Sequence, residues 1–141
     1  MSWQMWAVIS AIAAGATSVF AKAGLDDVPS NLGNAVRTAI VLVLALGVLV
    51  ASGEHSSISK VSGKAWVMLA LSAVATAVSW VAYFKALSLG SATPVTAIDK
   101  ASLVVTMALA VMFFGEAVSM KTSLGVVLIV GGALLASTGG R

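Results

Sequence analysis

Long apolar stretches, separated by short polar segments, dominate the pattern of hydrophobic and polar positions along this chain. None of them alternates with a period of two, and a continuous apolar run in lipid must be helical to satisfy its own backbone. A helix of about 20 apolar residues crosses the hydrocarbon core of a bilayer. The pattern therefore predicts an all-α integral membrane protein with five transmembrane helices. These helices are expected at about residues 3–21, 32–51, 65–89, 95–114 and 122–138.

The connections between these stretches carry the residues that begin and end helices. The first connection, residues 22–34, contains Pro29, which does not fit inside a helix, so Ser30 or Asn31 is expected to cap the second helix. The most hydrophilic connection is 53–64. The short loops that this pattern predicts leave no room for a separate soluble domain.

The composition supports the same conclusion. Of 141 residues, 60% are hydrophobic and 9% are charged, whereas about a quarter of the residues of a soluble domain are charged. Trp3 and Trp6 suit the interfacial belt of the bilayer, and the beginning of the chain has no basic region typical of a cleaved signal peptide. We expect one domain, residues 1–141, that is multi-pass in the inner (plasma) membrane.

The chemistry that the sequence offers excludes several classes of protein. There is no cysteine, and we find no metal-ligand spacing, phosphate-binding glycine loop or nucleophile–base arrangement. The net charge of +3 comes from basic residues spread over the apolar stretches, which form no basic face for nucleic acid. We therefore expect no enzyme, no cofactor, no metal and no nucleic acid partner.

The loop charges do not choose an orientation in the membrane. An odd number of helices places the two ends of the chain on opposite sides. Discounting the lysines embedded in or next to helices reverses the balance of positive charge between the sides, so the positive-inside rule gives no answer. Both dual insertion and chance remain open as explanations. The basic residues compared are Lys60, Lys64 and Lys121 on one side and Lys22, Arg37, Lys85, Lys100 and Arg141 on the other.

Ionisable residues cluster towards one side of the membrane. Lys22 ends the first stretch, Arg37 lies early in the second, and Lys85 lies about one turn before the end of the third. Asp99 and Lys100 lie about one turn into the fourth. Charges within apolar helices are costly and usually functional, although long side chains near a helix end also reach the headgroups. Both explanations remain open for Lys22 and Arg37, whereas function is favoured for Lys85.

The adjacent pair Asp99–Lys100 is the strongest local feature. Neighbouring residues of a helix do not face each other, so the two are expected to meet different partners. Asp99 is expected to meet a base of another helix or a substrate amine, and it is the candidate for proton coupling. The alternative is a structural ion pair that fixes helix packing.

Polar and aromatic side chains recur at helical spacing on the third and fourth stretches. Such hydroxyls either join helices and form hydrogen bonds to their own backbone, or line a water-filled cavity whose aromatic side chains can stack on a solute. Stripes on neighbouring helices favour the cavity. The residues concerned are Ser72, Thr76, Ser79, Trp80 and Tyr83 on the third stretch, and Thr96, Asp99, Ser102 and Thr106 on the fourth. The fifth stretch carries small residues instead, and Gly125 and Gly132 are expected to form a close helix–helix seam.

Several polar segments resemble one known family. Four segments resemble the EamA domain of the drug/metabolite transporter superfamily. They are SNLGNAVRT around Arg37, YFKALSLG around Lys85, IDKAS around Asp99–Lys100, and the later Gly115–Glu116. The single-domain, five-helix bacterial and archaeal branch is the most similar, and the resemblance covers nearly the whole chain. It implies an inverted-repeat unit that pairs as an antiparallel, ten-helix homodimer, with the first four helices lining the pathway. Related small multidrug exporters place a glutamate in their first helix, but here that helix has no acid, which leaves Asp99 to replace it.

Together these features predict a secondary transporter, an exporter, of a small organic solute by alternating access. The excess of basic groups favours an anionic or zwitterionic substrate, such as an amino acid, with Trp80 and Tyr83 against its apolar part. Two alternatives remain open: proton-coupled export of lipophilic cations, and a non-transporting membrane scaffold or lipid-handling subunit.

Overall fold

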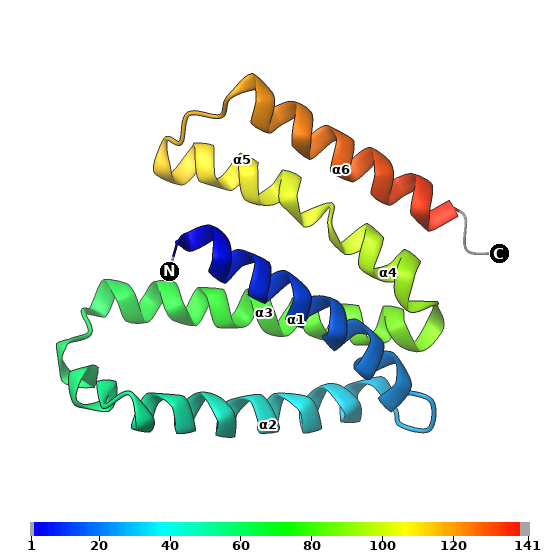
Figure 1. Cartoon of the computed structure of the whole chain (residues 1–141). Coiled ribbons are helices and arrows are strands. Elements are labelled where there is room, and N and C mark those ends of the chain that lie inside the picture. Colours follow the sequence, from blue (N-terminus) through cyan, green and yellow to red (C-terminus); the bar gives the residue numbers. More distant parts are fainter. Residues whose placement is uncertain (1, 139–141) are drawn as a thin grey trace. The chain divides into compact units, whose positions relative to one another are not determined.

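A computed structural model describes residues 2–138 of the chain, and every regular element within this range is helical (Figure 1). Met1 and residues 139–141 lie outside the described part, so Arg141 of the charge comparison has no structural account. The elements are α1 (Trp3–Gly24), α2 (Ser30–Ala51), the 3₁₀ helix η1 (Glu54–Lys60), α3 (Gly63–Leu89), α4 (Ala92–Asp99), α5 (Ser102–Phe114) and α6 (Met120–Thr138).

The five predicted transmembrane stretches are confirmed. The described part of the chain has five helical segments that are long and apolar enough to cross a membrane, with α4 and α5 together forming the fourth. Apolar side chains are exposed along all of them, for example Val43 at 68% and Leu135 at 76% of the full side-chain area. A single chain of this kind must be covered by lipid or by another helix surface. The protein is therefore a multi-pass membrane protein.

Two helices begin earlier than the apolar pattern predicts because serine caps precede them. The hydroxyl of Ser62 accepts a hydrogen bond from the Ala65 amide (3.2 Å), and α3 begins at Gly63. Ser119 accepts one from the Thr122 amide (3.1 Å), and α6 begins at Met120. Hydrophobicity alone does not detect these polar first turns.

The predicted side-chain cap of α2 is wrong. Ser30 already belongs to the helix, Pro29 occupies the cap position, and no side chain caps this end. The carbonyl of Pro29 accepts the first backbone bond, from the Gly33 amide at 2.9 Å. Proline suits this position because its fixed φ is compatible with a helix start and it has no amide to satisfy.

The fourth stretch is interrupted between α4 and α5. The amides of Lys100 and Ala101 donate to the carbonyls three residues earlier, at 3.1 and 2.9 Å, so the turn tightens before α5 begins. The prediction of one continuous helix here is corrected to two shorter helices. α5 ends at Phe114, and Gly115 caps it with a φ of +64°, the left-handed conformation that glycine adopts without cost.

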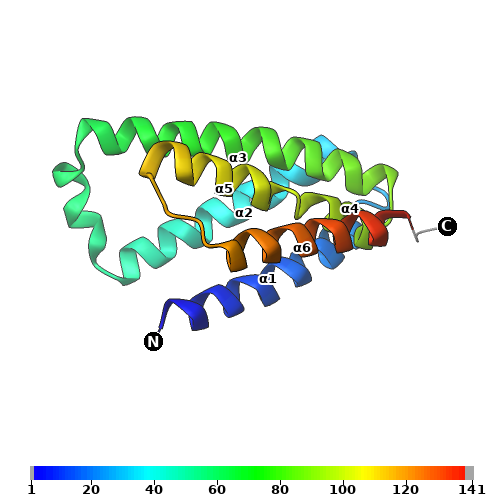
Figure 2. The ribbon, with the colours of Figure 1, turned by 90° about the horizontal axis from the view of Figure 1, so that it is seen from above.

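The chain divides into two compact units. One comprises residues 1–22 and 89–141, and in it α6 lies beside α4 (Figures 1 and 2). The other, residues 23–88, is a hairpin in which α2 and α3 run in opposite directions and η1 joins them at one end. The hairpin holds most of the site described below.

Apolar packing closes the end of the hairpin away from η1. Phe84 of α3 and Leu25 are buried, with 4% and 7% of their areas exposed. Gly33 of α2 faces both of them, and a Cβ atom at Gly33 would lie 2.8 Å from a Leu25 methyl carbon and 3.8 Å from the Phe84 ring. Glycine at this position therefore allows Leu25 and Phe84 to pack against α2.

Candidate functional site

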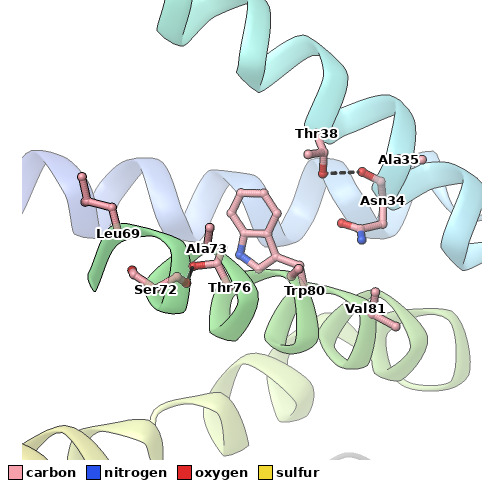
Figure 3. Close-up of a pocket in the computed structure, with 10 residues that line it drawn as sticks. Asn34, Ala35, Thr38, Leu69, Ser72, Ala73, Thr76, Trp80 and Val81 are labelled. Atoms are coloured by element: carbon pink, nitrogen blue, oxygen red, sulfur yellow. Dashed lines mark hydrogen bonds between the residues drawn. The ribbon is translucent and has the colours of Figure 1, made fainter. Parts of the chain in front are cut away.

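A cavity of about 680 Å³ lies between α2 and α3. The indole of Trp80 projects from α3 towards the α2 residues Asn34 and Thr38, which form the opposite wall (Figure 3). Ligand pockets for small molecules occupy about 300–1,000 Å³ and combine apolar walls with a few polar groups. The remaining lining residues are Ala35 of α2 and Leu69, Ser72, Ala73, Thr76, Ala77 and Val81 of α3.

Helical spacing explains why these side chains share one space. Asn34 and Thr38 lie four apart on α2, and Ser72, Thr76 and Trp80 lie four apart on α3, so each set follows one helix face. The two helices are antiparallel, and both faces border the same open space between them. Of the predicted stripe on α3, the structure brings Ser72, Thr76 and Trp80 to the cavity.

The threonine hydroxyls of the wall donate to their own helices. Thr38 donates to the Asn34 carbonyl at 2.7 Å, and Thr76 donates to the Ser72 carbonyl at 2.9 Å. This is the usual way in which threonine satisfies its proton in an apolar helix. The oxygen lone pairs still face the surroundings, so both hydroxyls offer hydrogen-bond acceptors to a solute.

Arg37 stacks on aromatic rings of α3. Its Cζ atom lies 4.0 Å from the centroid of the Trp80 ring and 5.7 Å from that of Phe84. Both distances are within the range of a cation–π interaction, which strengthens where water is excluded. Trp80 thus has two roles, since it also lines the cavity. The interaction holds the guanidinium at the hairpin rather than extended towards the headgroups.

The charge of Arg37 is not balanced by its own hairpin helices. Arg37 is the only ionisable residue of α2, and α3 contains lysines but no acid. Its Nη1 atom is enclosed and has no hydrogen-bond partner in the described part of the chain, and the same holds for Oδ1 of Asn34. The hairpin therefore presents a positive group with unused hydrogen-bonding capacity next to a cavity.

Asp99 and Lys100 differ from the prediction. Asp99 Oδ2 and Lys100 Nζ lie 3.9 Å apart, so these neighbours face each other rather than different partners. The physical reason is the interruption between α4 and α5, because the rule for adjacent residues applies to a continuous helix. With 41% and 49% of their side chains exposed, the pair is loose, and both groups remain accessible.

The other predicted residues lie outside this cavity. Tyr83 and Lys22 are half-buried, on α3 and α1, and neither is among the lining residues. Lys85 is exposed in α3, and its carbonyl accepts the Ser88 hydroxyl at 2.8 Å. The remaining polar residues of the predicted stripes are Thr96 of α4, which is half-buried, and Ser79 of α3 and Ser102 and Thr106 of α5, which are exposed.

The predicted seam on α6 has open space beside it. A Cβ atom at Gly125 or Gly132 would meet nothing within 4 Å, so among the described residues neither glycine packs closely against another helix of its own unit. Ala133, the buried residue of α6, lies next to Gly132. Docking through the glycines stays a prediction.

Asn34 and Thr38 are the polar site residues that the sequence alone does not single out. Asn34 lies where the predicted connection and the predicted second helix overlap, three and four residues before Arg37 and Thr38, the spacing of one helix face. That spacing was the available indication. Among residues 2–138, no group of three or more His, Cys, Asp and Glu side chains is placed to hold a metal ion.

These features define a class of protein: a multi-pass helical membrane protein with a solute-sized cavity and a half-buried arginine beside it. The EamA-like transporter family matches residues 1–138. A relative from Sinorhizobium sp, named the uncharacterized transporter in cobO 3'region, is 42% identical over 134 residues, which are 95% of each chain. No solved structure matches the chain significantly. The chain belongs to the EamA-like transporter family, and the resemblance noted in the sequence is confirmed.

Proposed function

We propose that this protein is a secondary transporter of the inner membrane that exports a small organic anion or zwitterion by alternating access. The observation that carries the proposal is Arg37. It places a charge in an apolar helix, and neither α2 nor α3 supplies a carboxylate to neutralise it. An uncompensated charge in a membrane helix is costly, and a substrate that brings the opposite charge offsets that cost.

The cavity between α2 and α3 supports a small solute. Its volume of about 680 Å³ lies within the range of small-molecule sites. Leu69, Ala73 and Val81 suit an apolar part of the solute, whereas Asn34 and the hydroxyls suit polar atoms. An amphipathic organic anion matches both kinds of wall.

The second half of the pathway is supplied, on this proposal, by another copy of the chain in the opposite orientation. Loop charges that set no orientation favour insertion in both directions. The open face at Gly125 and Gly132 offers a surface on which a second copy can pack closely. In an antiparallel homodimer the charged residues near one membrane face would occur at both ends of the transport pathway. Asp99, accessible beside Lys100, is the proposed coupling acid.

Transport by purified protein in liposomes tests the proposal. Counterflow is measured with labelled organic carboxylates, zwitterionic amino acids and, as a lipophilic cation, tetraphenylphosphonium. The proposal expects counterflow of at least one anion or zwitterion and faster movement than in protein-free liposomes. If only tetraphenylphosphonium moves, the proposal is wrong and the protein is an exporter of lipophilic cations. No movement of any solute, together with a stably co-purifying protein, would favour a scaffold.

A further inference from the structure

Two enclosed polar atoms of α2 have no hydrogen-bond partner within the described chain, and their chemistry is complementary. Nη1 of Arg37 is a donor, and Oδ1 of Asn34 is an acceptor. The residues lie three apart, so their side chains are neighbours on one helix face. They nevertheless form no hydrogen bond with each other.

Leaving both atoms without a partner destabilises the structure. A buried polar atom that loses water without gaining a hydrogen bond is costly, and native proteins contain few such atoms. The cation–π contact with Trp80, at 4.0 Å, stabilises the charge of Arg37 but supplies no acceptor for its N–H groups. A bound molecule that offers one acceptor and one donor would satisfy both atoms.

Space for such a molecule adjoins the two residues. Asn34 and Trp80 both line the cavity, and the guanidinium of Arg37 stacks on the Trp80 ring. The two atoms are enclosed in this structure, so binding requires Asn34 or Trp80 to rotate, and the neighbouring cavity leaves room for that movement. An apolar group of the same molecule would then lie against Ala73 and Val81 (Figure 3).

We propose that Arg37 and Asn34 together recognise a monocarboxylate that carries a hydrogen-bond donor on the adjacent carbon, with its apolar body in the cavity between α2 and α3. The carboxylate oxygen accepts from Nη1 of Arg37, and the neighbouring hydroxyl or ammonium group donates to Oδ1 of Asn34. This inference rests on the proposed function and narrows its substrate class.

The acceptor of Asn34 argues against more highly charged anions. A phosphate ester or a dicarboxylate placed on Arg37 brings further anionic oxygens, which an amide oxygen repels. The hairpin helices offer no second arginine to hold such oxygens. A single carboxylate with a neighbouring donor satisfies both unused atoms and adds no second anionic group beside the amide oxygen.

Three matched ligands test the inference on the unmodified, full-length protein. Mandelate has a carboxylate, a 2-hydroxyl and a phenyl group, phenylacetate lacks the hydroxyl, and 2-methoxy-2-phenylacetate, the O-methyl ether of mandelate, keeps the oxygen but cannot donate. Isothermal titration calorimetry measures binding, and counterflow in liposomes measures transport. Mandelate is expected to bind about tenfold more tightly than either analogue, the size of effect of one hydrogen bond to a buried acceptor.

Two substitutions assign this preference to the residues. Asn34→Leu is expected to bind the three ligands equally, and Arg37→Gln to weaken all three by about tenfold or more, the effect of losing a charged hydrogen bond. Ser79→Ala, an exposed position on α3 away from the cavity, is the control and keeps the preference. Each variant is first compared with the wild type by gel filtration and circular dichroism.

The outcomes separate this inference from the proposed function. Equal binding of the three ligands to the wild-type protein, or no binding of any of them, overturns the inference, and neither result depends on how the variants fold. If another anion still shows counterflow in the same liposomes, the proposed function stands without this substrate class. If no solute shows counterflow, the proposed function fails as well.

Discussion

The guanidinium of Arg37 lies over the indole of Trp80, with Cζ 4.0 Å from the ring centroid, and this contact joins α2 to α3. It holds a cation at the hairpin in a stretch where a long side chain otherwise extends to the headgroups. A desolvated cation–π contact of this kind contributes about 2 kcal/mol. The ring that stabilises the charge also forms a wall of the cavity, so changes at Trp80 affect both.

Replacing Trp80 with leucine is expected to slow transport. Without this ring Arg37 keeps only the more distant Phe84 ring, at 5.7 Å, and is held less firmly, so substrate affinity should fall by about tenfold, the equivalent of 1–2 kcal/mol. Trp80→Phe keeps an aromatic face and should retain most of the activity. The control is Trp66→Leu, an exposed position near the other end of α3. Equal losses in Trp66→Leu and Trp80→Leu, measured as the concentration for half-maximal counterflow, would contradict a specific role of the contact.

Gly33→Ala is expected to destabilise the hairpin. The new methyl group would lie 2.8 Å from a Leu25 carbon, so Leu25 or α2 has to move. Overpacking of this kind costs about 1–3 kcal/mol, and the roughly 1 kcal/mol by which alanine favours a helix over glycine offsets part of that cost. Gly47→Ala on the same helix is the matched control, because its methyl group meets nothing within 4 Å and it has the same helix gain. Thermal unfolding in detergent, followed by circular dichroism, should show a lower midpoint for Gly33→Ala than for Gly47→Ala. Equal midpoints in the two variants would contradict the close packing.

Asp99→Asn is expected to uncouple transport from the proton gradient. Asparagine keeps the size of the side chain but neither binds nor releases a proton. Counterflow exchange should continue, whereas accumulation driven by a pH difference should disappear. Lys100→Gln changes the charge at the neighbouring position and should keep gradient-driven accumulation. Undiminished accumulation by Asp99→Asn would remove Asp99 from the coupling mechanism.

Dual insertion is open to a direct labelling test, because the chain has no cysteine of its own. Asp26 precedes α2 and Ser57 follows it, so the two positions lie on opposite sides of the membrane once α2 spans it. Single variants Asp26→Cys and Ser57→Cys are treated with a membrane-impermeant maleimide in sealed vesicles. Insertion in both directions predicts about half-maximal labelling of each. Full labelling of one and none of the other would establish a single orientation.

The helices were largely predictable from the sequence because lipid imposes a simple rule: a long apolar run must satisfy its own backbone. The same rule does not detect the interruption at Lys100, since the segment Ala92–Phe114 as a whole has the mean hydropathy of a membrane span. Nor does it see the serine caps, because Ser62 and Ser119 lie in polar segments that hydrophobicity assigns to loops. Helix existence follows from hydrophobicity, whereas helix ends follow from individual hydrogen bonds.

The site was predictable only in part. Arg37, Trp80, Ser72 and Thr76 stand out as polar or aromatic residues at helical spacing in an apolar stretch. Their grouping with Asn34 and Thr38 depends on the register between α2 and α3, which the packing of Gly33 against Leu25 and Phe84 sets. Periodicity defines the face of one helix but not the residues that lie opposite it.

The central claim is that the solute passes through the cavity between α2 and α3. It is tested most directly by counterflow of the fastest-moving anion with Ala73→Trp and Ala75→Trp. Both substitutions add the same volume to α3, but Ala73 lines the cavity, whereas Ala75 is exposed and does not. A cavity filled by an indole should slow counterflow by about tenfold or more in Ala73→Trp, with Ala75→Trp close to the wild type. Undiminished counterflow in a well-folded Ala73→Trp variant would contradict the claim.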